Sequence, residues 1–274
     1  LFPYTTLFRS RTGGDNPDKG RVIQGDLFIK NTGTGALYLA NNANYLITVL
    51  GDYVQTGGTF VLNQAGGFGS LDIHGNFSMS DGVLAKNSLT NTSVINFRGT
   101  GEQTFIKTGG TISGPLDFEV SNGAVINFGT SILDGSTGTF RLQPDSKIIT
   151  SNPNGLNSTG PFGSIQTTNR SFSEQADYEF RGPVTGIFNT GASTTDAQPS
   201  IVSNLIINNA SGPVTLSKPV TIANNNGGTQ KLHLQNGALI TTATNILTLN
   251  DGVQATGVEA LTSNVPVLDR KSVV

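Results

Sequence analysis

The sequence predicts an all-β fold, and within that class a right-handed parallel β-helix built as a single continuous stack of short-stranded coils. The first reason is a repeat: positions 47, 49, 51, 52, 53, 58 and 60 match positions 71, 73, 75, 76, 77, 82 and 84 in residue type. Their offset of about 24 residues is typical of solenoids. The second reason is that Val, Ile, Leu and Phe recur with period two, as in half-buried strands, whereas no window has the apolar spacing of a helix. No charged or proline-rich linker divides the 274 residues, so one stack is favoured over two domains.

Each clear repeat predicts three strands joined by glycine turns, at 46–49, 53–55 and 59–62 in the first copy and at 71–73, 77–79 and 83–85 in the second. Parallel strands have no hairpin partner, so each coil must pair with the coils above and below it. Inward side chains then stack in rows, with Tyr53 over Phe77 and Phe60 over Leu84. The same offset reaches Gly99, and Gly25 opens a looser copy that is slightly out of register.

The rest of the chain extends this pattern to about nine to eleven coils. Further strands are expected within residues 26–30, 36–40, 94–114, 116–120, 124–128, 139–142, 147–150, 176–182, 201–222, 232–242 and 245–257. Residues 11–20 are polar and predict a loop or a frayed edge. Residues 152–170, rich in Asn, Gly, Pro and Ser, predict either a lateral loop or a break between two stacks, and residues 224–228 predict a wide corner.

The two ends look foreign to this pattern. Residues 1–10 read LFPYTTLFRS and residues 269–274 read DRKSVV. One sequencing-library adapter, translated from its two strands, resembles both. We therefore expect both segments to be adapter-derived artefacts. The natural segment, residues 11–268, would then be a fragment of a longer β-solenoid protein, and any signal peptide, anchor, sorting domain or catalytic module would lie outside it.

The composition excludes several kinds of partner. The chain has 16 basic and 18 acidic residues. Without the two terminal segments the counts fall to 13 and 17, which favours solubility, and the lack of a basic stripe argues against nucleic acid. No apolar run approaches the roughly 18 residues of a membrane helix, so no membrane insertion is expected within the fragment. Cysteine is absent, which excludes a disulfide framework and a thiolate metal site.

The acidic residues are the best candidates for catalysis, because a hydrolase needs two or three carboxylates close together. Asp117 and Glu119 share one strand face, as do Asp177 and Glu179. Both pairs alternate with inward apolar residues, such as Phe118, which favours solvated outward positions over a catalytic pair.

The metal-binding candidates are weaker. Asp134 begins a stretch that resembles half of a calcium loop, but one acid cannot supply six to eight oxygen ligands. His74 and His233 are the only histidines, and each sits in a strand without a neighbouring His or Cys, so surface positions are favoured over ligation. We predict no catalytic, cofactor-binding or metal-binding residue, and no cofactor.

Asparagine is abundant enough to suggest a structural role. Asn at one corner of successive coils can stack its side-chain amides into a ladder that satisfies backbone groups. Asn76, Asn96 and Asn127 are the members we expect. Such a ladder would explain the asparagine content without a ligand.

Several phrases resemble the repeats of large secreted β-solenoid surface proteins of Bacteroidetes-type bacteria. They are GDYVQTGGTF (51–60), HGNFSMSDGVL (74–84), VINFRGTGEQTF (94–105), SNLIINNASGPVTLSKPVTI (203–222) and NGALITTATNILTLNDGVQATG (236–257). The resemblance covers most of residues 22–262, except the looser stretch at 152–170. It implies a secreted, adhesin-like, cell-surface protein. Such proteins often end in a type IX secretion sorting domain, which we do not find in this sequence.

The sequence thus predicts a non-enzymatic extracellular repeat region. A stiff stalk with long polar faces of Thr, Ser and Asn suits weak multivalent contact with extracellular glycans or other cell surfaces. The first alternative is a carbohydrate-active parallel β-helix enzyme, a polysaccharide lyase or glycoside hydrolase, or its accessory scaffold. The second is an array of all-β sandwich modules. A groove lined by paired acids would favour the enzyme. A uniformly polar wall would favour the stalk, and antiparallel hairpins would favour the sandwich.

Overall fold

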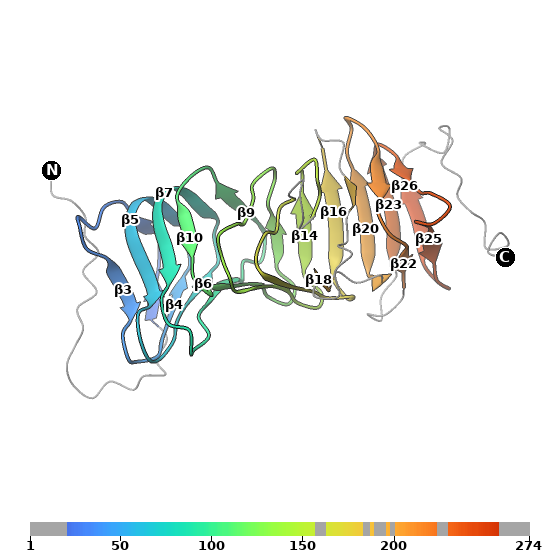
Figure 1. Ribbon diagram of the computed structural model, residues 1–274. Helices are drawn as coiled ribbons and strands as arrows, with labels where there is room; N and C mark the ends of the chain where they lie inside the picture. The colour runs from blue at the N-terminus through green and yellow to red at the C-terminus, as the bar shows by residue number, and fades with distance from the viewer. Residues whose placement is uncertain are drawn as a thin grey trace.

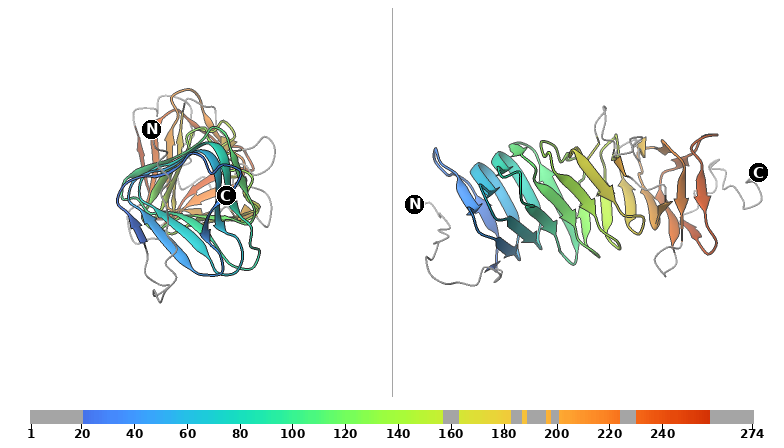
Figure 2. Two further views of the ribbon diagram at one scale, coloured as in Figure 1. Left: turned by 90° about the vertical axis from the view of Figure 1, so that its left-hand side faces the viewer. Right: turned by 60° about the horizontal axis from the view of Figure 1, so that its bottom comes forward.

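The chain forms an all-β parallel solenoid of about nine turns, extended along one axis (Figures 1 and 2). The computed structural model describes residues 21–156, 163–182, 187–188, 196–197, 201–223 and 230–257. Both predicted adapter segments, the corner at 224–228 and part of the 152–170 loop lie outside these residues. Every strand pair in the described part of the chain is parallel, unlike the hairpins of a sandwich. Among the same residues, no helix has the length and apolar character needed to cross a bilayer.

Two long sheets form two faces of the solenoid. The first contains β1 (Arg21–Ile23), β4 (Tyr45–Val49), β6 (Gly69–Ile73), β8 (Val94–Phe97), β11 (Asp117–Val120), β13 (Thr139–Leu142), β15 (Asn169–Phe172) and β18 (Asp196–Ala197). The second contains β2 (Leu27–Ile29), β5 (Tyr53–Asn63), β7 (Phe77–Lys86), β9 (Glu102–Lys107), β12 (Val125–Asn127), β14 (Lys147–Thr150), β16 (Asp177–Arg181), β20 (Asn204–Asn208), β23 (Lys231–Asn236) and β26 (Gln254–Gly257).

Shorter strands complete the coils. Near the N-terminus, β3 (Leu37–Ala40) pairs with the second half of β5, and β10 (Thr111–Ser113) pairs with the second half of β7. Towards the C-terminus there are two three-stranded sheets. One contains β17 (Ile187–Phe188), β21 (Val214–Leu216) and β24 (Leu239–Ile240), and the other contains β19 (Ile201–Val202), β22 (Val220–Ile222) and β25 (Leu247–Leu249). Viewed along the axis, the coils superpose as a closed outline around one interior (Figure 2, left).

The register confirms the predicted rows. Leu71 pairs with Ile47 on one side and with Ile95 on the other, one repeat length away in each direction. Tyr53 pairs with Phe77 and Phe60 with Leu84, as expected. The shifted first copy is also confirmed, because Leu27 pairs with Tyr53 and so lies slightly more than one regular repeat before its partner.

One detail of the predicted coil is wrong. The second and third strands are not separated by a glycine turn: β5 runs continuously over 11 residues and β7 over 10. β5 instead contains an irregularity, because its register with β7 shifts between Thr56 and Thr59. Gly58 has a φ of 68°, a left-handed conformation that glycine adopts without a steric penalty. The glycine pair at 57–58 therefore marks an irregular position inside a continuous strand.

Both long sheets continue across the 152–170 segment. β13 pairs with β15 and β14 with β16, which places strands from either side of the segment next to each other. The coil that joins the paired residues Lys147 and Asp177 is longer than the coil that joins Ile47 and Leu71. Leu156 and Ile165 are buried in the core. The segment thus lengthens one coil, and its described residues 152–156 and 163–170 include side chains that pack into the core of the stack.

A column of aromatic rings runs through the interior. Tyr53, Phe77, Phe105 and Phe128 follow one another with ring-centroid distances of 4.9, 4.7 and 4.8 Å. These distances match the ~4.8 Å spacing of paired strands, because residues in register on neighbouring coils lie one strand spacing apart. All four side chains are at most 1% exposed. Phe140, Phe172 and Tyr178 continue the aromatic contacts into the next coils.

Candidate functional site

The first carboxylate pair lies on the outward side of β11. Asp117 and Glu119 flank Phe118, whose side chain is fully buried in the core. Arg141 Nη1 lies 2.7 Å from Asp117 Oδ2, and the Thr139 amide donates to Asp117 Oδ1 at 2.7 Å. Glu119 Oε2 accepts a hydrogen bond from Gln143 Nε2 at 2.9 Å. All three donors belong to the next coil, so both acids hold two coils together.

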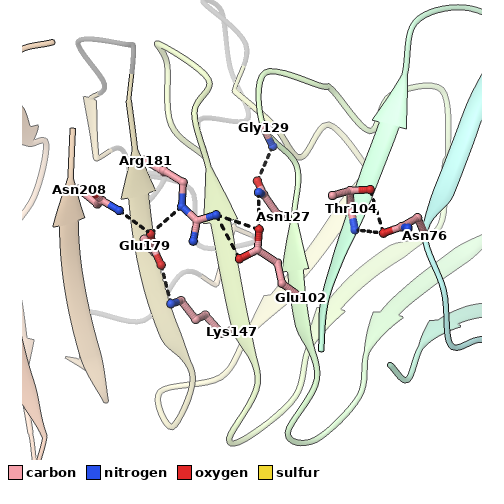
Figure 3. Close-up of polar contacts among 9 residues, drawn as sticks. All are labelled: Asn76, Glu102, Thr104, Asn127, Gly129, Lys147, Glu179, Arg181 and Asn208. Atoms are coloured by element: carbon pink, nitrogen blue, oxygen red, sulfur yellow. Dashed lines mark hydrogen bonds and ion pairs between the residues drawn. The ribbon is translucent and has the colours of Figure 1, made fainter. Parts of the chain in front are cut away.

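The second pair is Asp177 and Glu179 on β16. Glu179 belongs to a larger polar cluster (Figure 3). Glu179 Oε2 lies 2.5 Å from Lys147 Nζ, and Glu179 Oε1 accepts from Arg181 Nε at 2.8 Å and from Asn208 Nδ2 at 3.3 Å. Asp177 Oδ1 accepts from Asn204 Nδ2 at 2.6 Å. These donors come from β14, β16 and β20.

The expectation that these acids are solvated is wrong for two of them. Glu179 is 3% exposed and Asp117 is 8% exposed, although both point away from the core. The reason is that long side chains from neighbouring coils fold over the carboxylates and donate to them. Neighbouring coils lie only one strand spacing apart, so a long donor side chain on the next coil can reach the carboxylate.

Arg181 extends this cluster across several coils. Its Nη1 lies 2.8 and 3.1 Å from the two carboxylate oxygens of Glu102, a residue 79 positions earlier in the chain. Glu102 lies on β9 and Arg181 on β16, and β12 and β14 run between them. Asn127 of β12 also donates to Glu102, at 2.7 Å. We call Glu102, Lys147, Glu179 and Arg181 the charge cluster.

The charge cluster keeps its carboxylates ionised. Burial by itself would raise the pKa of Glu179, but hydrogen bonds from Arg181 and Lys147 outweigh burial and leave that pKa below its usual value. The pKa of Glu102 is likewise lowered: burial opposes the change, and hydrogen bonds from Arg181 and Asn127 overcome it. Burial raises the pKa of Asp177. Glu179 therefore has no proton to donate near neutral pH, and both of its oxygens are already occupied by donors.

The other predicted candidates lie apart. Asp134 is paired with Lys107 at 2.9 Å, and its side chain is 55% exposed. His74 follows β6 on the first face, whereas His233 lies within β23 on the second face, where its Nδ1 is 3.4 Å from Gln235 Nε2. Over the described ranges, no group of three or more His, Cys, Asp or Glu side chains lies close enough to hold a metal ion.

The predicted asparagine ladder is wrong, because its three expected members do not lie at one corner of successive coils. Asn76 lies at the corner before β7, Asn96 on the first face and Asn127 on the second, so the three do not stack. Each instead bonds to an acid of the preceding coil, Asn76 to Asp52, Asn96 to Asp72 and Asn127 to Glu102.

A different ladder occupies the corner before β5 and β7. Asp26 Oδ1 accepts the backbone N–H of Asp52 at 2.8 Å, Asp52 Oδ1 accepts that of Asn76 at 2.6 Å, and Asn76 Oδ1 accepts that of Thr104 at 2.8 Å. A Cβ atom on Gly75 would lie 2.4 Å from Asp52 Oδ1 and 2.4 Å from the Gly51 carbonyl oxygen of the preceding coil. In the repeated Gly-Asp and Gly-Asn dipeptides, the side-chain oxygen of the acid or amide therefore accepts a backbone N–H from the next coil. The glycine beside it leaves room for the preceding coil.

A scan against protein-family models finds no match, and searches of the curated proteins and of the solved structures find none. The functional argument therefore rests on the chain's own geometry.

Proposed function

We propose that this chain is a structural and adhesive stalk of a secreted or cell-surface bacterial protein, and that it has no catalytic role. The observation that carries the proposal is the use of the outward acids. Asp52, Asp72, Asp117 and Glu179 each accept donors from a neighbouring coil. Acids engaged in this way hold a rod together, whereas a hydrolase needs a carboxylic acid that keeps its proton and a second carboxylate free to act.

The mechanism is mechanical and interfacial. A solenoid in which each coil contacts its neighbours is stiff along its axis and presents the same kind of face repeatedly. Contact with glycans or with another cell surface would then come from many weak interactions, whose combined strength grows with their number. The resemblance to bacterial surface repeats supports the extracellular setting.

The test is retention under flow. Beads coated with residues 11–268 at several densities would be passed over immobilised glycans and over bacterial and host cell layers. The proposal expects retention that rises steeply with coating density, and no release of sugar products from soluble polysaccharides. Product release would favour the carbohydrate-active enzyme. Absence of retention on every surface would contradict the adhesive part of the proposal.

A further inference from the structure

The charge cluster spans the coil that carries the insertion. Lys147 pairs with Asp177 across the inserted segment, so the coil between β14 and β16 is longer than the regular coils near the N-terminus. The pair formed by Glu102 and Arg181 begins on β9 and ends on β16. It therefore bridges four adjacent strands of the second face, including both strands that flank the insertion.

Ile149 lies beneath this bridge. It pairs with Asn127 on one side and with Glu179 on the other, both of which point outward. Its neighbour Ile148 belongs to the hydrophobic core, whereas Ile149 does not. Even so, Ile149 is 0% exposed, while outward Phe28 and Ile106 of the same sheet are 48% and 46% exposed. A cover over Ile149 is needed, and the Arg181 side chain crosses from β16 towards Glu102 over β14 (Figure 3).

We infer that the charge cluster is a clamp that locks the inserted coil between its neighbours and seals Ile149. Two carboxylates and two cations balance each other, and Glu179 is nearly buried. Charge networks that are partly removed from water, with several hydrogen bonds each, hold their geometry better than isolated surface pairs. The clamp concerns only how the coils are held together, so a test of the clamp does not depend on whether the chain is adhesive.

Native-state hydrogen exchange tests the clamp on residues 11–268. The main variant is Glu102→Gln, which weakens the far end of the bridge and leaves Lys147, Glu179 and Arg181 in contact. The second is Arg181→Gln, which removes the bridge itself. The matched control is Arg98→Gln, because Arg98 pairs with Asp72 of the preceding coil at 3.1 Å and its side chain is 46% exposed.

The clamp predicts that backbone amides of β12 and β14 exchange at least about tenfold faster in Glu102→Gln and Arg181→Gln. Amides of β5 and β7 should keep their wild-type rates, and Arg98→Gln should leave β12 and β14 unchanged. Equal behaviour of Glu102→Gln and Arg98→Gln would overturn the inference, as would a uniform acceleration along the whole rod. If Arg181→Gln does not fold, Glu102→Gln decides the matter alone.

Discussion

Removing one ring from the aromatic column should weaken the stack more than any surface change. Phe77 is 0% exposed, and its ring lies 4.9 Å from Tyr53 and 4.7 Å from Phe105 in stacked geometry. Replacing a buried Phe by Ala typically costs about 3–5 kcal/mol, and the cost rises when the cavity cannot close. Here the strand spacing fixes the rings above and below, so the cavity should persist. We expect Phe77→Ala to cost about 4–5 kcal/mol.

The matched control is Phe28→Ala on β2, which lies in the same sheet and is separated from β7 by β5. The Phe28 side chain points outward and is 48% exposed, so its loss should cost less than about 1 kcal/mol. Urea unfolding followed by far-ultraviolet circular dichroism gives both values. Hydrogen exchange at β5 and β7 locates the effect, since repeat proteins can unfold in parts. If Phe77→Ala lost no more stability than Phe28→Ala, the aromatic column would not be the core of the stack.

Three further predictions concern the outward contacts. Gly75→Ala would place a Cβ 2.4 Å from both Asp52 Oδ1 and the Gly51 carbonyl oxygen and should lower the free energy of unfolding by about 1–3 kcal/mol. Gly101→Ala, where a Cβ would have nothing within 4 Å, should leave it unchanged. Equal effects of the two substitutions would contradict the close approach of neighbouring coils at this corner. Asn76→Ala removes an acceptor for the Thr104 amide and should cost about 1 kcal/mol; unchanged thermal stability would show that the ladder contributes nothing there. Because the pKa of Glu179 is lowered on folding, its contribution to stability is present above the usual pKa and is lost as pH falls through the folded-state value. The melting-temperature difference between wild type and Glu179→Gln should therefore shrink on acidification, and a constant or growing difference would contradict this.

The sequence predicts the fold and the stacked inward residues of the N-terminal coils well, because a regular offset directly indicates which residues lie above one another. Ile47, Leu71 and Ile95 follow from that offset alone. Further along the chain the offset drifts: the step from Phe118 to its partner Phe140 is shorter than the regular repeat, and the step from Lys147 to Asp177 is longer. The 24-residue offset then no longer predicts which residues pair, because a shift of one residue in register reverses which side chains face outward.

The candidate contacts are harder to predict for the same reason. The strand pattern places Asp117 and Glu179 on outward faces, but their burial depends on which donors lie in the next coil. The contact between Glu102 and Arg181 joins residues 79 positions apart, and no local pattern marks it. The corner ladder, in contrast, has a visible signal, since Gly51 precedes Asp52 and Gly75 precedes Asn76 at one offset. A search for repeated Gly-Asx pairs is enough to find it.

Single-molecule stretching of residues 11–268 between their two ends tests the proposed stalk most directly. A stack held coil to coil should resist and then lengthen in steps of about 80 Å, the span of a coil of about 24 residues at roughly 3.3 Å per residue. Longer steps should mark the inserted coil. Smooth extension without discrete steps would contradict the proposal that this chain acts as a stiff stalk.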